Sequence, residues 1–312
     1  MTRVFIALAL VASTAPAGPQ SQASIQASLV IDAVAFDRND RPVMDLKREE
    51  IEVWIAGYRV PIDSLTAVTA SDERAARSIV LILDNVTLHP AMAVRVKEIA
   101  RRFVNRLLPG DEMSIVTFDG GSMEITGDRK QLDDGIDAYH VRASGVRRID
   151  ELGEQVLNQA ASISRQLARP QDRRKTIVAL GAAFLFDTPL PPPSAGRELR
   201  QEWTDAVRAM AFSNVSFYVI EPGGVGATPL IGGDAGFARE SGGRAFANTN
   251  DFAGAVDRVM REAGNYYIIE VGDPPVQRKA DLRELDVRVL RPGVTIRARK
   301  AVPGTGAAPR RE

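Results

Sequence analysis

The sequence predicts an α/β protein with a doubly wound, mainly parallel sheet and a small additional β domain. Short apolar runs alternate with amphipathic helical stretches over residues 76–264, which is typical of parallel strands joined by right-handed crossovers. Extended β-type segments precede this region at 24–72 and follow it at 265–302. Because the ends of a domain often lie close together, we expect these two segments to pair into the small β domain.

Composition limits the class of protein. The 312 residues are 45% hydrophobic and 26% charged, which fits a globular protein with a substantial core. Lys+Arg and Asp+Glu each number 40, and this balance argues against broad binding to nucleic acid or to anionic membranes. The chain has no Cys and two His, so disulfides, thiolate metal sites and three-histidine zinc sites are excluded.

Residues 1–23 are interpreted as a signal peptide. Arg3 precedes the apolar run Val4–Ala12, which is too short to span a bilayer of about 30 Å. Small residues follow, and cleavage is expected after Ala17 or Ala23. We therefore expect a periplasmic or secreted protein with no membrane span after cleavage. A retained amphipathic anchor is the alternative.

The N-terminal β segment contains three candidate strands. Partial alternation in "ASLVIDAVAFD" (Ala27–Asp37) predicts the first strand, and a turn follows at 38–42. Ile51–Ile55 and Arg59–Leu65 are predicted to form a hairpin around Ala56-Gly57-Tyr58.

The α/β region opens with "SIVLILD" (Ser78–Asp84), a continuous apolar run expected of a strand covered on both faces. Pro90 suits the first turn of a helix over 90–108, whose apolar residues fall on one face. Further strands are predicted at Glu112–Phe118, Met123–Asp128, Arg173–Phe184, Asn214–Gly224 and Gly242–Ala247, and helices at Arg129–Ala138, Ile149–Ala168, Arg197–Ala211 and Asp251–Gly264. Extended segments follow at Asn265–Asp273 and Leu282–Arg299, and residues 303–312 are expected to be a disordered tail.

Taken in order, these segments resemble a known family. The matching pieces include "SIVLILD", "AVRVKEIARRFVNRLLPGDEMSIVTFDG", "RRKTIVALGAAF" and "ARESGGRAFANTNDFAGAVDRV". They resemble the von Willebrand factor A-like proteins, and within them an exported bacterial group described as VWFA-related proteins of acidobacteria. The resemblance implies a von Willebrand A or Rossmann-like sheet over 76–264.

The resemblance also implies a metal-ion-dependent adhesion site, in which oxygens at the carboxyl ends of the strands hold a hard cation, usually magnesium. The family pattern is Asp-x-Ser-x-Ser after the first strand, a later Thr, and an Asp after the fourth strand. Asp84 matches the first aspartate, but Val86 and Leu88 stand at the two serine positions. The segment "LGAAF" (Leu180–Phe184) carries no acid, and Asp187 follows only some residues later.

Arg147 or Arg148 stands about where the family has its threonine, and a guanidinium there would itself neutralise Asp84. We therefore expect no cofactor, with Mg²⁺ binding as the less favoured alternative. The favoured interpretation is structural: Asp84 caps the following helix or pairs with one of these arginines. The candidate crevice residues are Asp84, Asn85, Thr87, Asp119, Arg147 and Arg148.

No nucleophile elbow, phosphate-binding loop or His-Glu-x-x-His motif occurs in the sequence. The Gly-rich segment Glu221–Gly226 is interpreted as a crossover loop and His89 as a cap or surface residue. The leading hypothesis is an exported, non-enzymatic, adhesion-type module that binds a protein or an extracellular matrix or envelope component. The alternatives are an exported enzyme or a nucleotide- or small-ligand-binding protein that uses the same crevice, and a structural module of an envelope assembly.

Overall fold

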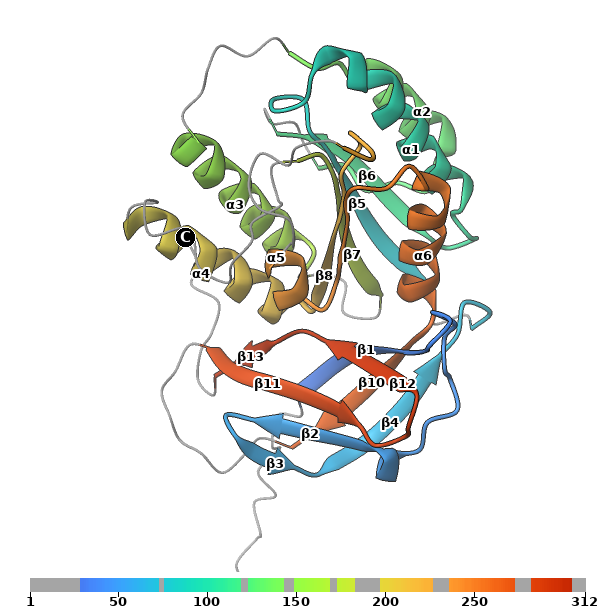
Figure 1. Cartoon of the computed structure of the whole chain (residues 1–312), viewed down its shortest axis with the longest axis vertical. Helices are drawn as coiled ribbons and strands as arrows, with labels where there is room; N and C mark the ends of the chain where they lie inside the picture. Colours follow the sequence, from blue (N-terminus) through green and yellow to red (C-terminus); the bar gives the residue numbers. More distant parts are fainter. Residues whose placement is uncertain are drawn as a thin grey trace, which may run out of the picture.

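The computed structural model describes residues 29–72, 76–118, 123–142, 149–168, 173–182, 197–226, 236–272 and 282–304 (Figure 1). Its α-helices are α1 (Ala93–Asn105), α2 (Arg129–Ala138), α3 (Ile149–Gln166), α4 (Arg197–Ser213), α5 (Gly236–Glu240) and α6 (Phe252–Gly264). Its strands are β1 (Leu29–Asp37), β2 (Ile51–Ile55), β3 (Tyr58–Val60), β4 (Ile62–Val68), β5 (Arg77–Leu83), β6 (Glu112–Thr117), β7 (Arg174–Leu180), β8 (Val215–Ile220), β9 (Ala245–Phe246), β10 (Tyr266–Val271), β11 (Leu282–Val289), β12 (Val294–Ala298) and β13 (Ala301–Pro303).

Five parallel strands form the sheet of the α/β domain, in the order β6-β5-β7-β8-β9. Beyond β6, Thr126 makes an isolated antiparallel bridge to Met113. If this edge segment is counted as a strand, the order along the chain is the 3-2-1-4-5-6 arrangement of a doubly wound sheet. The order reverses between β5 and β7, and this switch point is where such sheets place their ligands.

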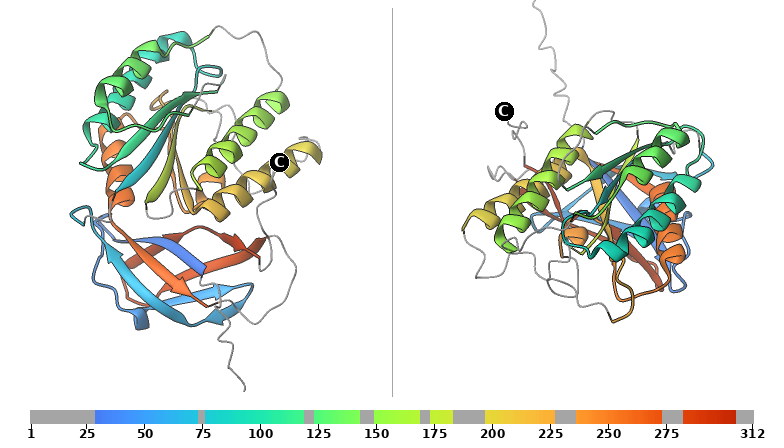
Figure 2. Two further views of the ribbon diagram at one scale, coloured as in Figure 1. Left: turned by 180° about the vertical axis from the view of Figure 1, so that it is seen from behind. Right: turned by 90° about the horizontal axis from the view of Figure 1, so that it is seen from above.

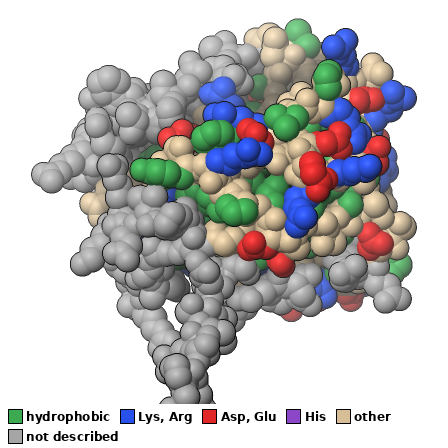
Figure 3. All heavy atoms as spheres, turned by 90° about the horizontal axis from the view of Figure 1, so that it is seen from below, with side chains coloured by type: hydrophobic (Ala, Val, Ile, Leu, Met, Phe, Trp, Pro, Cys, Tyr) green, Lys and Arg blue, Asp and Glu red, His purple; other side chains and the backbone are tan. Residues whose placement is uncertain are grey.

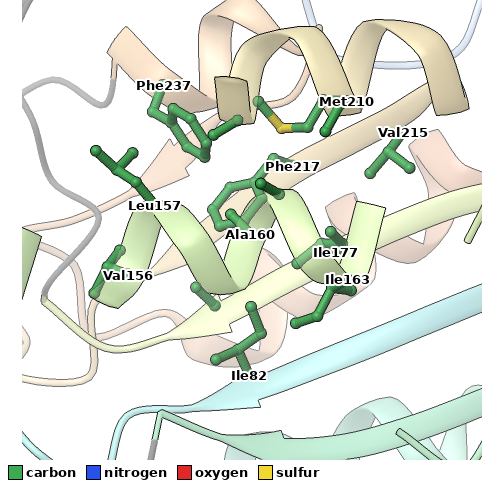
Figure 4. Packing of buried hydrophobic residues seen from close by; sticks show 14 of the residues in the cluster. Ile82, Val156, Leu157, Ala160, Ile163, Ile177, Met210, Val215, Phe217 and Phe237 are labelled. Carbon is green, nitrogen blue, oxygen red and sulfur yellow. The ribbon is translucent and has the colours of Figure 1, made fainter. Parts of the chain in front are cut away.

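Helices cover both faces of this sheet (Figures 1 and 2). All seven residues of β5 and of β7 are buried, as expected for strands that lie between two helical layers. The core under α3, α4 and α5 contains Phe217 and Phe237 (Figure 4). The Phe237 ring meets the rings of Trp203 and Phe217 edge to face, with centroids 5.0 and 5.1 Å apart. The opposite core lies under α1, α2 and α6.

The second domain consists of two four-stranded antiparallel sheets, ordered β12-β1-β10-β4 and β13-β11-β2-β3. Strand β1 pairs with β10, and β2 pairs with β11, so strands from both ends of the sequence form one core. Ile31, Val53, Ile269 and Leu285 are buried in that core. The predicted fold class, a doubly wound parallel sheet with a small β domain, is confirmed.

The predicted hairpin is correct in its first half and wrong in its second. Strands β2 and β3 pair across a two-residue turn, with φ of 51° at Ala56 and 82° at Gly57, as primed hairpin turns require. Pro61 then interrupts the predicted strand Arg59–Leu65, because proline has no N–H to donate to a strand ladder. After it, β4 joins the other sheet and pairs with β10.

Smaller differences concern short elements. The predicted strand Met123–Asp128 is reduced to the bridge at Thr126, and the predicted helix 90–108 begins with a 3-10 turn at Pro90–Met92. Strand β13 and helix α5 were not predicted as elements. The predicted signal peptide and residues 305–312 of the predicted tail lie outside the described residues.

No helix in the described ranges is long and apolar enough to cross a membrane. Seen from below, the β domain presents acidic and basic side chains next to each other, with hydrophobic side chains between them (Figure 3). The ion pairs Arg59–Glu52 and Arg288–Asp286 illustrate this mixing on β2, β3 and β11.

Ion pairs and polar contacts join the two domains at the amino edge of the parallel sheet. Arg174, at the start of β7, forms an ion pair with Asp32 of β1, and the two side chains are 2% and 9% exposed. Glu262 of α6 accepts hydrogen bonds from Tyr218 and from Arg297 of β12. We call this interface the seam.

Replacing Asp32 by Ala should destabilise the protein strongly. The substitution leaves the Arg174 guanidinium buried without its carboxylate, which typically costs about 3–5 kcal/mol. Urea unfolding of the full chain measures the change. Asp45→Ala is the control, since the Asp45 side chain is 78% exposed and its partner Arg291 keeps a second carboxylate, Glu50. If both substitutions lowered the free energy of unfolding equally, Arg174 and Asp32 would not act as a buried structural pair.

Candidate functional site

The candidate site lies at the switch point, on the carboxyl edge of the sheet. Asp84 follows β5, and Gly181 and Ala182 follow β7. The Asp84 backbone N–H donates to the Leu180 carbonyl at 3.1 Å, and the Ala182 N–H donates to Asp84 Oδ2 at 3.3 Å. The two strand ends that border the switch point are therefore joined directly through this aspartate.

The turn that begins at Asp84 folds around its own carboxylate. Asp84 Oδ1 accepts from the backbone N–H groups of Val86 (3.1 Å) and Thr87 (2.8 Å), and Oδ2 accepts from the Thr87 hydroxyl as well as from Ala182. Aspartate commonly stabilises a turn in this way. The Asp84 side chain is fully buried, so both oxygens are used inside the protein.

Burial raises the pKa of the Asp84 carboxyl above its ordinary value of 3.8. The hydrogen bonds from Thr87, Val86 and Ala182 act in the opposite direction, because they stabilise the ionised form.

Val86 and Leu88, which stand where the family pattern has serines, serve the packing of the sheet. Val86 packs against the core under α3 and α4, and Leu88 packs against the core under α1 and α6. The two residues therefore anchor the turn into both helical layers. Apolar contact replaces the hydroxyl groups that a cation would use.

Residues after α2 hold the same turn from the other side. The Tyr139 hydroxyl donates to the Asp84 carbonyl at 2.6 Å, and the Arg142 N–H donates to the Asn85 carbonyl at 2.9 Å. His89 accepts a hydrogen bond from the Ala91 N–H at 3.2 Å and so caps the 3-10 turn that precedes α1. These contacts give the turn little freedom to rearrange.

The structure brings Asp84, Asn85 and Thr87 together at the switch point. Asp119, Arg147 and Arg148, the other predicted crevice residues, lie outside the described residues, as does Asp187.

The described residues do not fit a hard divalent cation. Magnesium prefers near-octahedral oxygen ligation, whereas the side-chain oxygens of Asp84 and Thr87 in this turn are already bonded to each other. Within the described ranges, no group of three or more His, Cys, Asp or Glu side chains is placed to hold a metal ion.

A second feature of the carboxyl edge was not predicted from the sequence. Arg95 of α1 donates to the carbonyls of Pro222 (2.8 Å) and Gly223 (3.2 Å), so it holds the loop after β8. Asn250 accepts from the Val225 N–H at 3.2 Å. The described part of the Gly-rich segment is thus a hydrogen-bonded loop.

Two aliphatic side chains are prominent on this edge. Val94 in the first turn of α1 is 67% exposed, and Val225 in the loop after β8 is 65% exposed. We call these two residues the rim. Sequence analysis could have pointed to Val94, because it breaks the polar face of α1, whereas the exposure of Val225 depends on the fold.

Comparisons with known proteins give little further support for the assignment of the fold. No protein-family model matches the chain, and no curated protein matches it. Among solved structures, it is similar to the manganese-loaded TRAP protein of Plasmodium vivax, with 12% identity, a TM-score of 0.38 and coverage of 76% of this chain and 96% of that one. It is also similar to the N-terminal domain of TFIIH p34, with 11% identity, a TM-score of 0.33 and coverage of 61% and 99%. The fold class therefore rests on the strand order and burial described above.

Gly181→Ala should destabilise the switch point. A Cβ at this position would collide with the Asp84 side chain, lying 2.8 Å from its Cγ. Neither strand end can move freely, so we expect a loss of about 1–3 kcal/mol in urea unfolding. In Gly135→Ala, on α2, the nearest atom would be Ile115 Cβ at 3.7 Å. That control should stabilise the helix by up to about 1 kcal/mol. If the free energy of unfolding fell in both variants, or rose in both, the packing argument would be contradicted.

Asp84→Asn should change how stability depends on pH. Because the folded-state pKa of Asp84 is raised, its contribution to stability is complete below the ordinary pKa and is lost as pH rises through the folded pKa. The Asp84→Asn variant has no titratable side chain at this position, so it lacks this pH-dependent contribution to stability. Relative to the variant, the wild type should therefore melt at progressively lower temperature as pH rises above the ordinary pKa of 3.8. Circular dichroism melting curves measure the difference, and parallel pH profiles would contradict it.

Proposed function

We propose that the chain is an exported, non-enzymatic protein-binding module that uses the carboxyl edge of its parallel sheet without a bound divalent cation. One observation carries the proposal: both carboxylate oxygens of Asp84 are engaged by Thr87, Val86 and Ala182. The acid that would serve a cation-dependent adhesion site instead stabilises the turn. Contact with a partner then depends on the surface around it.

The rim supplies a surface of that kind. Val94 and Val225 are mostly exposed, and Arg95 fixes the loop after β8 against α1. Aliphatic side chains on a rigid support lose little conformational entropy when a partner covers them. The resemblance to von Willebrand factor A-like proteins supports a protein, matrix or envelope component as the partner. The signal-like N-terminus supports a periplasmic or secreted location.

Affinity capture from the envelope fraction of the source cells tests this proposal. The tagged wild-type chain should retain the same partner in Mg²⁺ and in EDTA. Val94→Asp and Val225→Asp should abolish capture, because they place a charge where apolar contact is expected. Leu290→Asp is the matched control, since Leu290 is 54% exposed on the turn between β11 and β12. It should capture the partner as the wild type does.

Two outcomes would contradict the proposal. Loss of the partner in EDTA would show that a cation is required. Equal capture by the rim variants and the wild type would place the contact elsewhere. A thermal-shift screen with divalent metals, nucleotides and sugars addresses the enzyme or small-ligand alternative, which predicts a large shift; a ligand at 100 times its Kd adds about 2.7 kcal/mol.

A further inference from the structure

Two buried arginines cross the seam beside each other. Arg174 is 2% exposed, and it bonds to Asp32 of β1 and, at 2.8 Å, to the Ser216 hydroxyl of β8. Arg299, which follows β12, is 5% exposed and also links the region of β8 to β1. It donates to the Asn214 side chain just before β8 and, at 2.6 Å, to the Val30 carbonyl of β1.

The partners of the two arginines lie two residues apart on each side. Asn214 and Ser216 belong to the same stretch of chain, as do Val30 and Asp32. The guanidinium groups are therefore neighbours that span the same gap between β1 and β8.

Among the described residues, Asp32 is the carboxylate that acts on both Arg174 and Arg299. Burial lowers the pKa of Arg299 to about 10; the positive charge of Arg174 acts in the same direction, and Asp32 opposes it. At neutral pH both arginines carry a charge, so in the described part of the chain two positive charges lie beside one carboxylate, that of Asp32. Buried charges are ordinarily matched, because an unmatched one is costly.

Each arginine also has an unused donor. Nε of Arg174 and Nε of Arg299 are buried, and neither has a hydrogen-bond partner in the described part of the chain. Nearly all buried polar groups in proteins are hydrogen-bonded, and an exception points to an unseen water or ion. A water would satisfy a donor but leave the charge unmatched, whereas an anion would do both.

We propose that the seam binds a small monovalent anion, chloride or another halide, at the Nε groups of Arg174 and Arg299. The surroundings favour a small ion. The ring of Tyr266 lies 4.9 Å from the Arg174 guanidinium carbon, and Tyr266 and Ser216 are themselves 3% and 4% exposed. Because these side chains are buried, we expect a small ion to be favoured over a bulky anion such as gluconate. The bound ion would tie the β domain to the α/β domain.

Bromide provides the direct test. Crystals of the full chain soaked in bromide should show an anomalous peak in contact with Nε of Arg174 or Arg299. Bromide-soaked crystals with no peak at the seam overturn the proposal, whatever the melting curves show. A water in that place in the same crystals overturns it as well.

Melting curves at constant ionic strength provide the solution test. Replacing gluconate by chloride should raise the melting temperature in a saturable way, by about 3 °C at ten times the Kd. Arg299→Met should abolish the chloride-specific rise. Arg291→Met should keep it, because Arg291 is already matched by Asp45 and Glu50. If Arg299→Met does not fold, the bromide crystals test the site without it. Equal melting temperatures of the wild type in chloride and in gluconate would contradict the site.

Discussion

The arrangement of the two domains depends on the contacts that two buried arginines make across the seam. Arg174 reaches from β7 to Asp32, and Arg299 reaches from the β domain to Asn214. A buried guanidinium that loses a charged or hydrogen-bonding partner is costly, so a shift between the domains that broke these contacts would destabilise the protein. The β domain is thereby held at the amino edge of the parallel sheet, where Arg174 and Ser216 are buried.

At the carboxyl edge the buried charged group is an acid, Asp84, and it also needs hydrogen-bonding partners. The Asp84 carboxylate is buried, and the donors that satisfy it come from its own turn and from Ala182. A cation would need the oxygens that these donors occupy, so a stable turn and metal ligation compete for one side chain. Val86 and Leu88 strengthen the turn by packing into both cores. The fold can therefore keep an aspartate at its switch point for a structural reason.

Local patterns were sufficient to predict the parallel sheet, but not the contacts that assemble the molecule. The apolar run of β5 and the spacing in α1 follow from which faces are buried, and each is visible within one segment. Asp32 illustrates the limit: nothing in the sequence around it distinguishes it from a surface acid, yet it pairs with Arg174, 142 positions away. No local pattern marks such a partner. Pro61 was a usable signal, because it marks the point where one strand must end and another begin.

The candidate site was predictable to a similar extent. The sequence shows that Val86 and Leu88 stand at the hydroxyl positions, but it does not show which groups bond to Asp84. They include Ala182, which becomes a neighbour only through the parallel pairing of β5 and β7. The rim was not anticipated, because exposure of Val225 depends on how Arg95 holds the loop after β8. That support matters for recognition. A rim on a fixed loop is ordered before the partner arrives, so less of the binding free energy is lost to ordering it. Under the function proposed above, the engaged carboxylate of Asp84 and the apolar rim would lead to recognition by shape and apolar contact, without a shared metal ion.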